Sequence, residues 1–354
     1  MIKSFDEVFE DVTKLGVKIK TDEYHPIGKY QIIDQGQEAV AGYSDLEDGV
    51  FENVPAIVFG DHTRIVKYVD QPFFLGADGV KVLRSRFKDA NYRYLYYALK
   101  SVKIPNTGYN RHFKWLKEAK IYYPNSEEQS KIVLILDEIS SVIEHRQRQL
   151  QKLDELVKAR FIELFGDMFL NSKAWKKQAL DSLADVVSGI TKGRKTKEPQ
   201  LIEVPYMAVS NVKDGYIDWT PVKTIQATQQ EIEQYRLLPD DVLMTEGGDP
   251  DKLGRGAILK EPLQNCIHQN HIFRVRLNES LILPAFFEEY LKHQKAKRYF
   301  LGCAKQTTGI ASINMRQLKA LPVLLPPLEL QEQFAAFVEQ TDKSKVAVQT
   351  ALRK

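Results

Sequence analysis

The chain has 354 residues and a nearly balanced charge, with 50 Lys and Arg against 47 Asp and Glu. That length suits two domains, and a hydrophobic fraction of 43% is typical of a soluble globular protein. The sequence excludes a membrane span, because its longest aliphatic run covers only residues 132–136 and a span needs about 20 apolar residues. It lacks a signal-peptide pattern, and Cys266 and Cys303 have no metal or redox spacing, so we expect a cytoplasmic protein with reduced thiols.

Residues 1–124 are predicted to form a first globular block with many short strands. Alternating apolar runs separated by Asp-Gly and Gly-Asp turns indicate strands at 30–33, 56–59, 64–69 and 80–83. An amphipathic helix at 92–100, a glycine-containing loop at 106–112 and a strand at 121–123 follow.

Residues 126–165 are predicted to form one long helix, within a spacer segment at 125–166. Ser126 and Gln129 suggest a capping box at its start, and Gly166 suggests its end. Steps of four and three residues, interrupted by Arg146 and Arg160, give the narrow apolar stripe of a coiled coil. The stripe consists of Ile132, Leu136, Ile139, Ile143, Leu150, Leu153, Val157 and Leu164. Such a helix would be about 60 Å long and needs a partner helix. The two arginines could pair with Glu339 or Asp342, or extend to the edge of the coil.

Residues 167–326 are predicted to form a second block, and 327–354 a second spacer helix. The predicted elements of this block are strands at 204–209, 241–244, 257–259, 272–275 and 321–325, with a helix at 284–300. The terminal helix carries a weaker stripe at Phe334, Val338, Val348 and Leu352.

The two blocks end in the same pattern of helix, glycine loop, Leu-Lys pair, strand and proline-led helix. A shift of 202 residues superposes Pro124 on Pro326, Glu127 on Glu329, Gln129 on Gln331 and Leu150 on Leu352. A chance likeness between two short amphipathic helices is the alternative. A duplication predicts an α+β protein in which two globular domains are joined by two long antiparallel helices with pseudo-twofold symmetry. Two similar heads at a fixed spacing suit a duplex with two half-sites.

The helices also resemble a known family. Segments 124–132, 153–156 and 161–167 are similar to the central conserved region of specificity subunits of type I restriction-modification enzymes, and 325–334 to the distal one. The resemblance implies two target recognition domains, each reading one half of a split asymmetric DNA sequence. It also implies that the helices dock two methyltransferase subunits and that restriction/translocase subunits join for cleavage. S-adenosylmethionine, ATP and Mg are then expected on those partners and not on this chain. The first block is shorter than the second, which suggests that an N-terminal element is missing or abbreviated.

The sequence favours binding without catalysis. Residues 189–196 do not have the glycine spacing of a phosphate loop, and no Asn-Pro-Pro-Tyr or Asp-Pro-Pro-Tyr run is present. Glu118 and Lys120 lack the upstream Pro-Asp of a nuclease site. Cys266, His268 and His271 are too few for a zinc site, which needs about four ligands, so we expect no metal.

Candidate DNA contacts are the cations and polar side chains of loops, because Lys and Arg bind phosphates while Arg, Asn, Gln and Thr read base edges. In the first block these are Thr107, Tyr109, Asn110, Arg111 and His112, with His62 and Arg64 on a hairpin. In the second block they are Lys192, Arg194, Lys195, Lys252, Arg255, Lys305, Gln306, Thr307, Thr308, Ser312 and Asn314. For residues 192–197, a solvated charge run is an equal explanation. For the hairpins at 60–64 and 247–256, turn chemistry alone is an equal explanation.

Three functions remain open at this point. The leading one is a DNA sequence-recognition subunit without activity of its own. The others are a coiled-coil scaffold that assembles proteins and ignores DNA, and a solitary enzyme. Salt-dependent duplex binding separates the first from the second.

Overall fold

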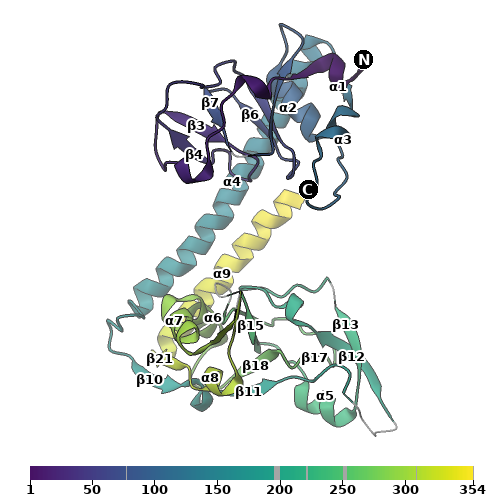
Figure 1. Cartoon of the computed structure of the whole chain (residues 1–354). Helices are drawn as coiled ribbons and strands as arrows, with labels where there is room; N and C mark the ends of the chain where they lie inside the picture. The colour runs from purple at the N-terminus through teal and green to yellow at the C-terminus, as the bar shows by residue number, and fades with distance from the viewer. Residues whose placement is uncertain (77, 195–199, 221, 250–252, 308, 354) are drawn as a thin grey trace. The chain divides into compact units, whose positions relative to one another are not determined.

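The computed structural model describes residues 1–76, 78–194, 200–220, 222–249, 253–307 and 309–353 (Figure 1). The chain divides into two compact units, Met1–His145 (unit 1) and Arg146–Lys354 (unit 2). The division falls inside the long helix α4, Ser126–Phe165, so each unit contains about half of that helix.

Unit 1 contains three small sheets. A four-stranded antiparallel sheet has the order β2-β8-β5-β6, a three-stranded sheet has the order β4-β3-β7 with β3 and β7 parallel, and β1 pairs with β9. The strands are β1 (Ile2–Ser4), β2 (Phe9–Asp11), β3 (Tyr30–Ile33), β4 (Gly42–Ser44), β5 (Ala56–Gly60), β6 (Val66–Val69), β7 (Phe73–Leu75), β8 (Val80–Ser85) and β9 (Lys120–Tyr122). The helices are α1 (Phe5–Val8), α2 (Tyr92–Lys100) and α3 (Phe113–Lys117).

Helix α2 forms where its apolar spacing predicts. The Asn91 side chain accepts a hydrogen bond from the Tyr94 amide at 3.0 Å and so caps the first turn. Tyr94, Leu95 and Leu99 then face the buried aromatic cluster that includes Phe5, Phe9 and Phe59.

Unit 2 repeats this topology. Its sheets have the orders β11-β18-β14-β16, β13-β12-β17 with β12 and β17 parallel, and β10-β21. The strands are β10 (Lys176–Ala179), β11 (Ala184–Ser188), β12 (Ile202–Met207), β13 (Lys223–Ala227), β14 (Val242–Thr245), β16 (Gly256–Ile258), β17 (Ile267–His268), β18 (Ile272–Leu277) and β21 (Pro322–Leu325). The matching helices are α6 (Pro284–Lys292), α8 (Met315–Lys319) and α9 (Leu328–Arg353). The order of pairing therefore confirms the internal duplication.

The extra residues of unit 2 form inserted elements. These are α5 (Gln229–Tyr235), α7 (Gln294–Cys303) and a small sheet of β15 (Gly247–Gly248), β20 (Ile310–Ser312) and β19 (Lys305–Thr307). At the start of the first block, β1 and β2 correspond to β10 and β11, so this pair is present there. It is abbreviated, with three residues in each strand against four in β10 and five in β11. The predicted helix at 284–300 is also divided. His293 adopts an extended backbone conformation there, and its side chain caps α7.

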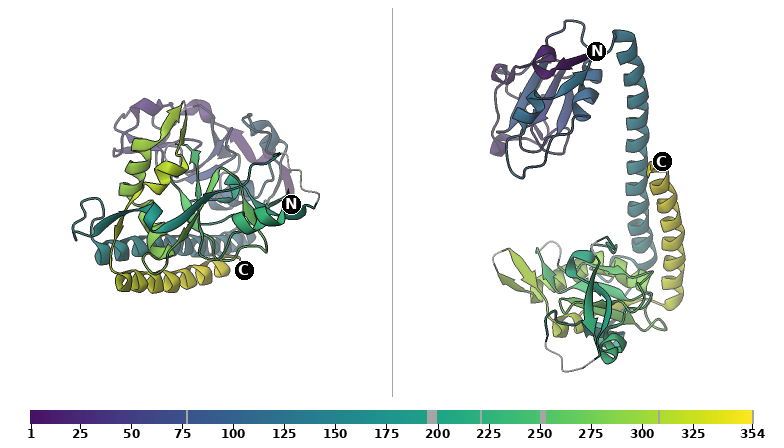
Figure 2. Two further views of the ribbon diagram at one scale, coloured as in Figure 1. Left: turned by 90° about the horizontal axis from the view of Figure 1, so that it is seen from below. Right: turned by 90° about the vertical axis from the view of Figure 1, so that its right-hand side faces the viewer.

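Helix α9 packs against the second half of α4 in antiparallel orientation (Figure 2). The Phe334 ring lies 5.3 Å from Phe161 and 5.6 Å from Phe165, while eleven residues further along α9 the Lys345 ammonium lies 2.8 Å from Asp154. The contacts run in opposite directions along the two helices, as predicted.

The apolar stripe is buried only in part. Val157, Leu164 and Phe334 are buried, and Leu136, Leu150, Leu153, Val338, Val348 and Leu352 are half-buried. Ile139 and Ile143 are 48% and 41% exposed, so the expectation of a continuous buried seam is wrong there. Helix α9 has 26 residues against 40 in α4, which makes it too short to cover the whole stripe.

The stripe arginines have local partners. Arg160 pairs with Glu163 at 2.8 Å and lies over the Phe337 ring, and Arg146 donates to Gln149 at 2.9 Å. The suggested pairing with Glu339 or Asp342 is therefore wrong. The i,i+3 neighbours on the same helix are within reach of the arginines without any rearrangement of the coil.

A glutamine and a proline explain the repeated start of the two long helices. Gln129 and Gln331 are 4% and 0% exposed, and each donates its side-chain N–H to the carbonyl of the proline five residues earlier, at 2.9 Å. The cap of α4 is Asn125, whose side chain accepts from the Glu128 amide at 2.9 Å, and not Ser126 as predicted. Buried amide groups need partners, so this arrangement ties each helix to the strand before it.

We expect Gln331→Ala to lower the free energy of unfolding of unit 2 by about 2–4 kcal/mol, since Gln331 also bonds Leu281 O and Leu283 N. Gln129→Ala removes a single bond and should cost about 1 kcal/mol in unit 1. Urea titrations followed by tryptophan fluorescence measure both. Exposed Gln340→Ala is the control, and equal effects at the three positions would contradict the assigned roles.

Candidate nucleic-acid interface

The loop at residues 105–111 of unit 1 is held on a hairpin that follows β5. Asp61, which is 3% exposed, accepts a hydrogen bond from the Phe113 amide at 2.7 Å through Oδ1. Its backbone carbonyl accepts from the His112 amide at 2.8 Å. The two bonds fix the end of the loop beside the hairpin, although the segments are about 50 residues apart in sequence.

His112 supports this loop from within. It is 0% exposed, its Nδ1 lies 3.0 Å from the Asp61 carbonyl oxygen, and its Nε2 lies 3.4 Å from Thr107 Oγ1. The expectation that His112 contacts DNA is therefore revised, because a fully buried ring offers no edge to a ligand.

The other predicted residues of unit 1 come together on the surface. Tyr109 is 86% exposed and stacks on His62 with ring centroids 4.6 Å apart and planes 7° apart. Arg111 is exposed, and the side-chain amide of Asn110 donates to the Thr107 carbonyl, which closes the loop into a compact turn. Arg64 has a left-handed φ of 64° and donates to the Ile104 carbonyl at 3.4 Å. The loop thus presents a guanidinium, a hydroxyl and a flat ring, groups that bind phosphates and stack on bases.

Unit 2 contains the same construction at the equivalent place. The Ile313 amide, two residues before α8, donates to the Glu246 carbonyl at 2.9 Å, much as the His112 amide, directly before α3, donates to the Asp61 carbonyl. Strand β20 lies between β15 and β19 and brings Ser312 opposite both Gly247 and Lys305. A cleft of about 550 Å³ beside them is lined by Gly247, Gly248, His271 and Ser312.

Several residues predicted in unit 2 have structural partners instead. Asn314 caps α8 by accepting from the Gln317 amide at 2.9 Å. Arg194 forms a bidentate pair with Glu231 of α5 and donates to the Gln226 carbonyl at 3.2 Å. The Arg194 hydrogen bond also lowers the pKa of Glu231 below its usual value. Both side chains therefore have structural roles, and their contact with DNA stays a prediction.

The remaining predicted residues divide into two groups. Lys192 and Lys305 are exposed, Ser312 and Arg255 are half-buried, and only the backbone of Gln306 and Thr307 is described. Lys195, Lys252 and Thr308 lie outside the described residues.

Sequence reasoning missed an acidic group at this place. Glu246 Oε2 lies 2.5 Å from His271 Nδ1 at the mouth of the glycine-lined cleft. A carboxylate can accept from the amino group of cytosine, so an acid can also be a base reader. Its position directly before Gly247 and Gly248 was the available signal.

The histidine and cysteine pair considered for metal binding is part of the core. Cys266 and His268 are both 0% exposed, and burial raises the pKa of the Cys266 thiol to about 12. His268 Nδ1 lies 3.1 Å from the Tyr235 carbonyl oxygen. Within the described ranges, no three or more His, Cys, Asp and Glu side chains gather as a metal site. The same ranges contain no helix that is both long and apolar enough to span a membrane.

Comparison with known proteins identifies the class. A family model described as the type I restriction modification DNA specificity domain matches residues 1–155 and 172–354. The chain belongs to this family of type I DNA specificity proteins, which confirms the resemblance seen in its helices.

The relatives differ in how much of their length is matched. A putative type I restriction enzyme MjaX specificity subunit of Methanocaldococcus jannaschii is 29% identical over 169 residues, which cover 48% of this chain and 39% of that protein. The EcoR124I/EcoR124II specificity subunit of Escherichia coli is 22% identical over 94% of this chain and 84% of its own length. A crystal structure of an S subunit from M. genitalium covers 100% of this chain and 92% of its own, with a TM-score of 0.56 at 18% identity, which shows a shared fold. None of these findings supports a scaffold without DNA specificity.

We expect the stability of unit 2 to fall with acid through His268. Burial lowers the pKa of His268 from 6.5 to about 4, so the unfolded chain binds a proton that the folded chain does not between these pH values. The contribution of His268 to the free energy of unfolding is fully present above pH 6.5 and falls by about 3 kcal/mol as the pH decreases towards 4. Urea unfolding at pH 7 and pH 4.5 measures the change. His268→Gln should flatten the difference between the two pH values, and an unchanged difference would contradict this origin.

Proposed function

We propose that this chain is the non-catalytic DNA-recognition subunit of a type I restriction-modification complex. On this proposal each unit reads one half of a split, asymmetric duplex sequence, and α4 with α9 forms the spacer. The supporting observation is the repeated site: in both units a backbone amide shortly before a short helix donates to the carbonyl just after the third strand of the larger sheet.

Chemistry is then carried by other chains in the cytoplasm. Two methyltransferase subunits would bind S-adenosylmethionine, and restriction/translocase subunits would bind ATP and Mg. The half-exposed stripe of α4, with Ile139 and Ile143, is the surface we assign to subunit docking. Aliphatic side chains in register along a helix suit a partner helix.

Methylome sequencing tests the proposal. We expect co-expression of the chain with its neighbouring methyltransferase gene to give a bipartite methylated motif whose two halves are separated by an unspecified stretch of fixed length. A contiguous motif, or no motif, would contradict it. Assays of nuclease activity and methyl transfer by the purified chain alone should be negative.

The loop of unit 1 should control one half of the motif. Exchange of residues 107–111, or the single change Arg111→Ala, removes the groups that face the solvent, and it should relax one half-site while the other is read as before. Lys88→Gln is a matched control. The loop lies beside Gly60, which pairs with Val80 at the start of β8, whereas Lys88 follows the other end of that strand. If both halves change, the assignment of one unit to one half-site is incorrect.

A further inference from the structure

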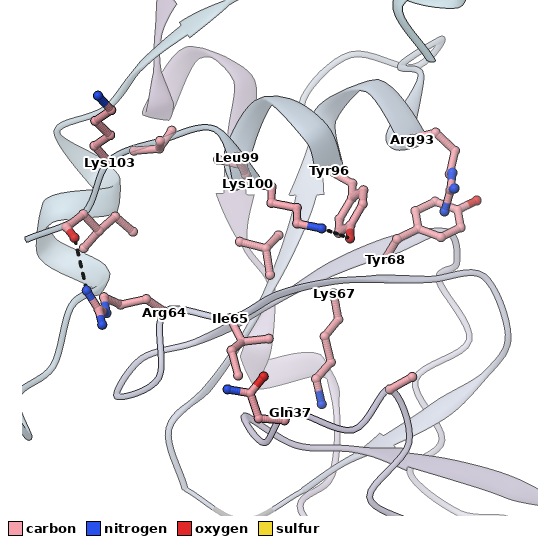
Figure 3. A pocket seen from close by; sticks show the side chains of 14 residues that line it. Gln37, Arg64, Ile65, Lys67, Tyr68, Arg93, Tyr96, Leu99, Lys100 and Lys103 are labelled. Carbon is pink, nitrogen blue, oxygen red and sulfur yellow. Dashed lines mark hydrogen bonds between the residues drawn. The ribbon is translucent and has the colours of Figure 1, made fainter. Parts of the chain in front are cut away.

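A cleft of about 750 Å³ lies in unit 1 between α2 and the edge strand β6 (Figure 3). Lys100 and Tyr96 of α2 lie on one side of it, and Ile65, Lys67 and Gln37 lie on the other. Arg64 and Lys103 lie at one end of the cleft in this view. Lys103 is two residues before the loop at 105–111, which we call the recognition loop. The lining includes five cations and no Asp or Glu, although the chain as a whole is nearly balanced in charge.

Two of the five cations are neutralised by carboxylates. Lys67 lies 3.2 Å from Asp34, and Arg93 lies 2.5 Å from Asp137. The other three, Arg64, Lys100 and Lys103, have no carboxylate partner among the residues that the structure describes. Lys100 is instead held beside Tyr96, with its Nζ 3.2 Å from the tyrosine hydroxyl. The cleft therefore carries uncompensated positive charge.

The duplicated fold shows that unit 2 does not carry this charge. Helices α2 and α6 each have nine residues, and counting from their starts places Tyr96 opposite Glu288 and Lys100 opposite Lys292. In unit 2 the lysine pairs with Glu288 at 3.1 Å and with Glu289 at 3.4 Å. The equivalent helix α6 carries its lysine in ion pairs, so the fold does not require the unpaired lysine of α2 in unit 1.

Arg64 also has an unusual backbone. Its φ of 64° is left-handed, a conformation that Gly or Asn adopts at lower cost than Arg. The turn places the guanidinium at the mouth of the cleft, two residues from the His62 ring that stacks on Tyr109. The cleft is thus continuous with the recognition loop through Arg64 and Ile104.

We propose that this cleft binds the sugar-phosphate backbone of duplex DNA beside the half-site read by unit 1, with Arg64, Lys100 and Lys103 as phosphate contacts. This proposal rests on the function proposed above. The three cations are spread from the end of the cleft to its middle and are not gathered at one point (Figure 3). Charges that are spread out in this way suit successive phosphates along a strand better than the clustered phosphates of a free nucleotide.

The test measures affinity of the full chain, co-purified with its methyltransferase partners, for a duplex carrying the methylated motif. Each lost phosphate contact should reduce the slope of log affinity against log salt by about 0.9. We expect the double variant Lys100→Gln/Lys103→Gln to lose about two units of slope, which shrinks the affinity ratio between 50 and 200 mM salt about tenfold. The motif read by methylome sequencing should stay the same in both halves.

Matched variants separate charge from folding. Lys100→Arg/Lys103→Arg keeps both charges and should keep the wild-type slope, as should Lys88→Gln. Tyr96→Glu recreates the spacing of Glu288 and Lys292 and should neutralise Lys100 in place, whereas Tyr96→Phe should not.

The possible outcomes lead to different conclusions. An unchanged slope in the double variant, with specific binding intact, overturns the cleft proposal and leaves the recognition function standing. Absence of specific binding by the wild type overturns the recognition function itself. A deoxynucleoside monophosphate titrated calorimetrically should bind the wild type and the double variant equally weakly. Saturable binding to the wild type alone, without a change in duplex slope, would assign the cleft to free nucleotides and overturn the proposal.

Discussion

The aromatic contact between the two long helices organises unit 2. Phe334 of α9 meets Phe161 and Phe165 of α4, and Phe286 of α6 stacks on Phe161 with centroids 5.5 Å apart. These rings are at most 2% exposed, and they belong to one continuous core with Val323 and Leu324 of β21. The helix pair and the sheets of unit 2 therefore share a single hydrophobic core. A change in the packing of the two helices should therefore shift the sheets of unit 2 that share their core, because close-packed interiors transmit small displacements.

A second constraint acts in both units at the recognition loops. A short helix, α3 or α8, follows the loop, and an amide one or two residues before the helix bonds the carbonyl just after the central strand. In unit 1 the loop residues Thr107 to Arg111 are exposed and free to differ. This separation of a fixed frame from variable contact residues explains how one fold can present Tyr109 and Arg111 in one unit and a glycine-lined cleft beside Glu246 in the other.

The duplicated units also differ in their electrostatics. The face of α2 carries a lysine without an acidic partner, while the same face of α6 carries a lysine between two glutamates. Exposed charges contribute little to stability, so this difference can change without a large effect on folding. Contacts with a polyanion depend directly on such charges, which makes the pattern informative about binding.

The sequence by itself determined the regular elements and the repeat. The bounds of α4 and α2, most strands, and the equivalence of Gln129 with Gln331 follow from periodicity and spacing, which depend on near neighbours in the chain. Only the tertiary structure decided the partners of individual polar side chains. Arg194 bonds a residue 37 positions away, His112 is buried beneath a loop anchored by Asp61, and Asn314 caps a helix. These outcomes depend on which distant segments of the chain come into contact, and the local pattern of cations and amides in the sequence does not specify those contacts.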